Sequence, residues 1–157
     1  TKPFNRDDYI DIGNVSGKVK DIDLFITTLM TYDNKTITVP NGLVNTSILI
    51  NHSKEDIRRV DSKFNIGYSS DIVLAKQLMK DICDRSDMVL EDPEPVIGVS
   101  DHGESAVIMD LLAWCHTDDY WTLKYFLEEE VKHVFDENNI AIPYPQMDIH
   151  IEKKDDK

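Results

Sequence analysis

The sequence lacks the long hydrophobic run that a membrane-spanning helix needs. None of its apolar stretches approaches the roughly 20 residues that cross a bilayer. The N-terminus also lacks the basic, apolar and small-residue order of a signal peptide. The residues alone therefore predict a soluble polypeptide. The chain starts at Thr1 rather than Met, which leaves open that it is a piece of a longer protein.

Sequence motifs for catalysis or cofactor binding are missing as well. There is no GxxxxGK(S/T) phosphate loop and no GxGxxG, and the five histidines include no HExxH motif. Gly103-Glu104-Ser105 lacks the second glycine of a nucleophile elbow because position 107 is Val. In the run from Cys115 to Asp119 we expect Asp118 or Asp119 to cap a helix rather than to bind a metal. The sequence therefore predicts no enzyme, no cofactor and no metal site.

Cysteine is scarce, with only two residues in the chain. Cys83 and Cys115 lie in a predicted helix and a predicted strand, and they lack the CxxC spacing of a redox or zinc motif. We expect both to be buried, reduced and to behave as small apolar core residues.

Basic residues are few, at 17 against 30 acidic residues, and the net charge is −13. Residues 1–63 carry nine basic and nine acidic side chains, whereas residues 64–157 carry eight basic and twenty-one acidic ones. Neither part offers a basic stripe that could release counterions from a nucleic acid, which argues against a nucleic-acid partner. The step in charge predicts two modules with different surroundings.

The first third of the chain reads as short strands separated by turns. Alternating apolar and polar residues recur between pairs of turn residues such as Gly13-Asn14, Asp33-Asn34 and Pro40-Asn41-Gly42. About five strands within roughly 50 residues, without a long helix, predict a small β-barrel or sandwich.

The pattern changes after a polar linker at residues 53–58. Two helices are expected among four strands, each helix with an apolar stripe at i, i+3, i+4 and i+7 spacing. The first is capped by Ser69 or Ser70, and the second ends at Asn138-Asn139. The expected order is β-α-β-β-α-β, a ferredoxin-like split βαβ with both helices on one face. In chain order, the expected elements are a strand at 60–68, a helix with the stripe 75, 78, 79, 82 and 83, strands at 96–99 and 106–114, a helix with the stripe 123, 127, 131, 134 and 135, and a strand at 140–142.

A further stretch, from Ile142 to Ile151, follows this already complete module. Two prolines make its start stiff and extended, and apolar residues then alternate with polar ones as in a strand with one wet face. A strand this regular needs a neighbour, in this chain or in another copy. We expect the remaining residues, 153–157, to form a charged, frayed tail.

The residues resemble the cytoplasmic region of the small-conductance mechanosensitive channel (MscS) family. The resemblance extends over nearly the whole chain, and the ordered set of motifs is more specific than any one of them. It rests on Pro3-Phe4, Asp8 to Gly13, Gly17-Lys18-Val19, Ile22, Thr27-Thr28-Leu29, Asp33, Val39 to Gly42, Ile50 to Ser53 and Pro143 to Asp148.

The resemblance implies an α+β architecture in four parts. These are an Sm-like middle β domain at 1–55, a ferredoxin-like α/β domain at 56–143, a barrel strand at 144–152 and the tail at 153–157. It also implies a homoheptamer whose terminal strands form a parallel intersubunit β-barrel. The barrel residues would be Tyr144, Pro145, Gln146, Met147, Asp148, Ile149, His150 and Ile151.

The resemblance also implies a function. Membrane helices would lie upstream of Pro3 and Phe4, in the cell (inner or plasma) membrane, with this region facing the cytoplasm. The region would form a cage below a pore that opens under membrane tension in osmotic downshock and passes ions and small solutes. As a hypothesis, acidic residues such as Glu128, Glu129 and Glu130 would line this vestibule and enrich permeating cations.

The chain departs from the family at three turn positions. Asp7, Asn14 and Asn139 stand where the family tends to have glycine. Asp and Asn tolerate left-handed backbone best among the other residues, so we expect the turns to survive.

Two alternatives stay open from the residues. The main one is a soluble two-domain regulatory protein whose ferredoxin-like module senses a small ligand. The aromatic residues Tyr120, Trp121, Tyr125 and Phe126 could stack on such a ligand, although their helical spacing is more typical of core or subunit contacts. A hydrolase using Ser105, His116 and Asp118 is the more distant alternative.

Overall fold

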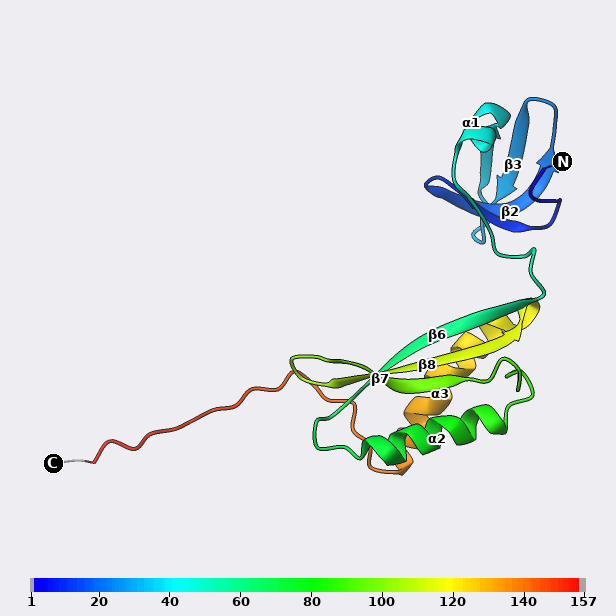
Figure 1. Ribbon diagram of the computed structural model, residues 1–157. Helices are drawn as coiled ribbons and strands as arrows, with labels where there is room; N and C mark the ends of the chain where they lie inside the picture. The colour runs from blue at the N-terminus through cyan, green and yellow to red at the C-terminus, as the bar shows by residue number, and fades with distance from the viewer. Residues whose placement is uncertain (1, 156–157) are drawn as a thin grey trace. The chain divides into compact units, whose positions relative to one another are not determined.

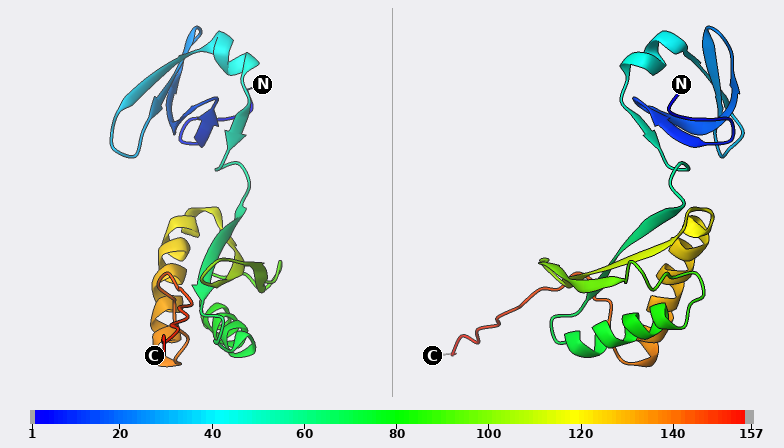
Figure 2. Two further views of the ribbon diagram at one scale, coloured as in Figure 1. Left: turned by 90° about the vertical axis from the view of Figure 1, so that its left-hand side faces the viewer. Right: turned by 45° about the vertical axis from the view of Figure 1, so that its right-hand side comes forward.

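The computed structural model describes residues 2–155. Contacts between residues divide the chain into two compact units, residues 1–57 and residues 58–157. The units are described separately below and are called the β domain and the α/β domain. Figure 1 and Figure 2 show the strands and the short helix of the β domain, and the sheet and two longer helices of the α/β domain.

The β domain is a five-stranded antiparallel sheet of order β4-β3-β2-β1-β5. Its elements are β1 (Tyr9–Ile12), β2 (Val15–Ile22), β3 (Ile26–Met30), β4 (Thr36–Pro40), α1 (Asn41–Thr46) and β5 (Leu49–Asn51). A small core is formed by buried residues of the sheet together with Phe4, which precedes β1, and Val44 of α1: Phe4, Ile10, Ile12, Val19, Leu29, Val39 and Val44. The prediction of about five short strands is confirmed in this unit.

The helix α1 is the element of this unit that the sequence did not predict. The run Pro40-Asn41-Gly42 suggested only a break, but Pro40 takes the N-cap position of a six-residue helix. The side chain of Asn41 holds the loop between β2 and β3 in place. Its amide donates to the carbonyl oxygens of Asp23 and Leu24 at 2.8 and 2.9 Å, and its oxygen accepts from the Thr27 hydroxyl at 2.8 Å.

The α/β domain has a three-stranded sheet of order β6-β8-β7. Its elements are β6 (Ile57–Ile66), α2 (Ile72–Asp84), β7 (Val96–His102), β8 (Val107–His116), a 3-10 turn (Thr117–Asp119) and α3 (Tyr120–Glu137). Both helices cover the same face of the sheet, where alternate residues of β6 and β8 are buried. The mixed α+β fold is confirmed.

The predicted helix stripes form the core of this domain. Both stripes are buried except for Leu78 and Val134, which are partly buried and pack against the core. Phe64 of β6 and Phe135 of α3 meet edge to face, with ring centroids 6.4 Å apart. Because a 3.6-residue period places such positions on one side of a helix, the stripes could be predicted from spacing alone.

The structure corrects three details of the expected α/β domain. Residues 140–142 do not form the predicted fourth strand of this domain, although Ile140 is buried and the Ala141 carbonyl accepts from the Gly67 amide at 3.0 Å. The side chain that caps α2 belongs to Asp71, which accepts from the Leu74 amide, and not to Ser69 or Ser70. The helix α3 begins after a 3-10 turn, and no side chain caps it.

Two of the three expected left-handed turn residues have positive φ. Asp7 has φ 72° and Asn139 has φ 57°, whereas the first β-hairpin places its left-handed residue at Gly13, not at Asn14. Asp7 and Asn139 therefore adopt the left-handed backbone that glycine adopts without steric penalty, as the short polar side chains of Asp and Asn allow.

Asn139, with its positive φ, lies just after the end of α3, so a variant there tests the left-handed turn that ends this helix. We expect Asn139→Ala to lower the free energy of unfolding by about 1 kcal/mol, because a Cβ with no local hydrogen bonding disfavours positive φ. The matched control, Asn139→Gly, should remain within about 0.5 kcal/mol of the parent chain. Urea unfolding followed by circular dichroism measures both, and equal stability of the Ala and Gly variants would contradict the assignment.

Candidate functional site

The terminal segment, residues 144–152, is extended, exposed along its whole length and unpaired within the chain. Met147, Ile149 and Ile151 are 83%, 72% and 86% exposed. Among the described residues, its one hydrogen bond to the rest of the domain is from the Gln146 amide, which donates to the Ser105 hydroxyl at 3.0 Å. The predicted strand is therefore absent from the single chain, because no second strand is available to accept its backbone hydrogen bonds. Of the predicted tail, Asp156 and Lys157 lie outside the described residues.

The three candidate vestibule residues have different surroundings on α3. Glu128 pairs with Lys124 at 3.1 Å, one turn earlier on the same helix. Glu130 is partly buried and pairs with Arg85 at the end of α2 at 2.6 Å. Glu129 is exposed and has no ion pair or hydrogen bond among the described residues. Consecutive helical residues project about 100° apart, so the three carboxylates cannot share one surface.

The two residues of the predicted membrane junction also differ from each other. Phe4 is 2% exposed and belongs to the β-domain core. Pro3 is exposed, and its carbonyl oxygen accepts from the Asn51 side chain at 3.3 Å. The start of the chain is thus fastened to the β domain by a buried ring.

An exposed aromatic surface lies on α3. Trp121 and Tyr125 are 47% and 68% exposed, and their rings lie 5.9 Å apart. Tyr120 is partly buried, meets Trp121 edge to face with ring centroids 5.2 Å apart, and lies under the Arg58 guanidinium at 3.7 Å. Phe126 points the other way and packs against the core. The helical spacing of these four aromatic residues predicted that they would lie in the core or in a subunit contact. It did not indicate which residues would be buried and which exposed.

The reactive groups named from the sequence do not gather into a catalytic or metal site. No group of three His, Cys, Asp or Glu side chains among the described residues could hold a metal ion. Cys83 and Cys115 are free and buried, as predicted. Burial raises the pKa of the Cys83 thiol to about 11 and also raises that of Cys115, so both stay protonated at neutral pH.

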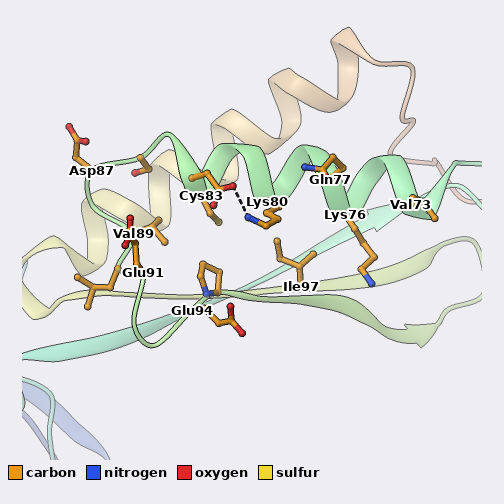
Figure 3. Close-up of a pocket in the computed structure, with 14 residues that line it drawn as sticks. Val73, Lys76, Gln77, Lys80, Cys83, Asp87, Val89, Glu91, Glu94 and Ile97 are labelled. Atoms are coloured by element: carbon orange, nitrogen blue, oxygen red, sulfur yellow. Dashed lines mark hydrogen bonds and ion pairs between the residues drawn. The ribbon is translucent and has the colours of Figure 1, made fainter.

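A cleft beside α2 is the feature that the sequence did not reveal. It has a volume of about 890 Å³ and lies between α2, the loop that follows it and the start of β7. Figure 3 shows Lys76 and Lys80 on the helix side and Glu91 and Glu94 on the opposite segment. The cleft forms only where the helix, the loop and the strand pack together, so no spacing in the sequence indicated it.

Within the part of the chain that the structure describes, no helix has the length and apolarity that crossing a bilayer requires.

Comparisons with known proteins identify the class. Residues 1–54 match the family model described as mechanosensitive ion channel, beta-domain. Residues 60–142 match the one described as mechanosensitive ion channel MscS, C-terminal. The chain belongs to the MscS family of mechanosensitive ion channels. Membership in a family of channels bears out the prediction that the chain is not an enzyme, and it confirms the resemblance read from the sequence.

Individual relatives agree with the family match. The small-conductance mechanosensitive channel of Edwardsiella ictaluri is 36% identical over 150 residues, which cover 96% of this chain and 52% of that protein. The crystal structure of Helicobacter pylori MscS in a closed state superposes with a TM-score of 0.90 at 31% identity, over 97% of this chain and 60% of that one. MSL1 of Arabidopsis thaliana shares the fold, with a TM-score of 0.75 at 19% identity over 91% of this chain and 54% of that one. This chain therefore spans about half the length of the curated relatives it matches.

Proposed function

We propose that this chain is the cytoplasmic part of a mechanosensitive channel that opens under membrane tension and passes ions and small solutes. The observation that carries the proposal is the terminal segment. An extended, half-apolar segment without a partner has backbone amides and apolar side chains that another copy of the chain can satisfy. The family match supplies the reason to expect a channel rather than a soluble sensor.

The proposed assembly is a homoheptamer whose terminal segments pair into a barrel. Residues 144–151 supply the strand, with Met147, Ile149 and Ile151 on one face and Gln146, Asp148 and His150 on the other. Burial of an isoleucine or methionine side chain contributes about 1.5–3 kcal/mol, and seven copies repeat the contribution. A closed barrel also leaves no unpaired strand edge.

The aromatic surface on α3 is proposed as a second contact between copies. Exposed Trp and Tyr side chains are typical of the energetic centres of protein interfaces. Trp121 and Tyr125 stand one helical turn apart on a rigid helix, which keeps the entropy cost of burying them low.

Trp121 gives this contact a direct readout, since the chain has only two tryptophans. In a Trp114→Phe background, the emission of Trp121 is expected to shift to shorter wavelength as the protein concentration is raised and copies assemble. Trp121→Ala should raise the dissociation constant at least tenfold, by loss of a large buried side chain. Thr122→Ala, exposed on the same helix turn, is the matched control. Emission that stays constant while the mass increases would contradict the proposed contact.

The membrane helices are proposed to lie before Pro3, in the cell membrane, with this region in the cytoplasm. The buried ring of Phe4 would then transmit force between those helices and the β-domain core. A net charge of zero in residues 1–63 suits a position near anionic headgroups, which repel acidic surfaces.

The acidic α/β domain is proposed to enrich cations in the vestibule. Of the three candidates on α3, Glu129 has the carboxylate that no basic side chain neutralises, so Glu129→Gln is expected to reduce cation preference more than Glu128→Gln. Reversal potentials of the assembled channel in a salt gradient measure the preference. Anion preference of the parent channel, or identical potentials in all three channels, would contradict the proposal.

The channel function itself can be tested in cells. The gene that encodes this chain together with the proposed upstream membrane helices, expressed in bacteria without mechanosensitive channels of their own, is expected to restore survival of an osmotic downshock. Excised patches from these cells should show currents that appear under suction. Absence of tension-activated current in cells that contain the protein in the membrane would refute the proposed function.

A further inference from the structure

The cleft beside α2, here called the α2 cleft, has the size of a small-molecule site. Its volume of about 890 Å³ falls within the usual range of about 300–1,000 Å³ for ligand pockets. All its lining residues, between Val73 and Ile97, belong to the α/β domain. The cleft is therefore complete in a single chain and does not depend on assembly.

The helix side of the α2 cleft offers one unpaired positive charge. Lys80 lines the cleft, but its ammonium pairs with Asp84 at 2.7 Å. Lys76, one turn earlier, has no ion pair or hydrogen bond among the described residues. Figure 3 shows its side chain extending from α2 toward the strands.

The opposite side of the α2 cleft offers three unpaired negative charges. Asp87, Glu91 and Glu94 line it from the segment between α2 and β7. Each is exposed, and none pairs with another described side chain. The free charges that point into the cleft are thus one positive, on Lys76, and two negative, on Glu91 and Glu94, while the Asp87 carboxylate points away beyond the end of α2.

The floor between these walls is apolar. Val89, Pro95 and Ile97 are partly buried there, next to the buried Cys83. The Cys83 thiol, with its pKa raised by burial to about 11, is neutral at physiological pH and adds a small apolar contact. An aliphatic stem of a ligand would find van der Waals contact and no competing charge on this floor.

We propose that the α2 cleft binds a small dibasic amino acid, a solute with one carboxylate, two ammonium groups and an aliphatic stem. Its carboxylate pairs with Lys76, and its two ammonium groups pair with the carboxylates of Glu91 and Glu94. The stem lies over Val89 and Ile97. Charge-assisted hydrogen bonds at both ends fix the orientation of the ligand.

Three probes of similar length distinguish a dibasic amino acid from a diamine and from an amino acid with a single ammonium group. L-lysine carries all the groups, cadaverine lacks the carboxylate, and 6-aminohexanoic acid lacks the second ammonium group. Either analogue leaves a charged group of the cleft unmatched, so each should bind at least about tenfold more weakly than L-lysine. Titration calorimetry on the intact chain measures the three dissociation constants.

Two variants locate the bound ends. Lys76→Met should weaken L-lysine about tenfold and leave cadaverine unchanged, whereas the double variant Glu91→Gln, Glu94→Gln should weaken both. Lys132→Met, on the exposed side of α3, is the matched control and should change neither affinity. The proposal is overturned if none of the probes binds, if cadaverine binds the parent chain as tightly as L-lysine, or if Lys76→Met leaves L-lysine binding intact.

Discussion

Removal of all residues beyond 143 is expected to abolish self-assembly while the α/β domain stays folded. Within the chain, the terminal segment contributes one hydrogen bond to the rest of the domain, between Gln146 and Ser105, and no buried side chain. Its loss therefore costs the single chain little. In the proposed barrel, the same truncation removes the strand of every copy together with its apolar face.

Sedimentation of the truncated and intact chains at matched concentrations measures this effect. The intact chain should reach a sevenfold multiple of 18.1 kDa, and the truncated chain should sediment as a single copy. Lys153→Ser, Lys154→Ser is the matched control, because it changes the charged tail and keeps the proposed strand. A truncated chain that assembles as well as the intact one would show that other surfaces hold the copies together.

The second large effect is expected inside the α/β domain, at Phe135. This ring is fully buried and meets Phe64 edge to face with centroids 6.4 Å apart. Phe135→Ala should lower the free energy of unfolding by about 3–5 kcal/mol, because the substitution removes apolar contacts and leaves a cavity. Such a loss is a large part of the stability of a domain this size.

Tryptophan emission follows this domain alone, since Trp114 and Trp121 both lie in it. Urea unfolding of dilute protein gives the stability, and Tyr125→Ala, at a side chain 68% exposed, should change it by less than about 0.5 kcal/mol. A Phe135→Ala chain as stable as the Tyr125→Ala chain would mean that the two helices do not pack on the sheet as described.

The regular elements could be predicted from the sequence because their causes are local. The stripe through Ala75, Met79 and Ile82 follows the helical period, and these residues are fully buried. The left-handed end at Asn139 follows from the tolerance of asparagine for positive φ. The α2 cap was wrong by one or two residues because Ser69, Ser70 and Asp71 are all good capping residues, and only Asp71 accepts from the Leu74 amide.

The functional features were harder to predict because they depend on how side chains pair and elements pack in three dimensions. The run Glu128-Glu129-Glu130 reads as one acidic patch, yet Arg85 and Lys124 pair with two of the three carboxylates. The α2 cleft joins a helix to a loop and a strand that follow it in the chain. The terminal strand has the alternation of a strand, but a strand also needs a partner, and the pattern does not say which chain supplies it.

Hydrogen exchange at the backbone amides of residues 147–151 tests the intersubunit barrel most directly. In the single chain these amides have no acceptor among the described residues, so they should exchange at the rate of an unstructured peptide. In the assembled protein, pairing with neighbouring copies should slow alternate amides at least a hundredfold. If the assembled protein exchanges them as fast as the dilute single chain does, the terminal segments do not form the barrel.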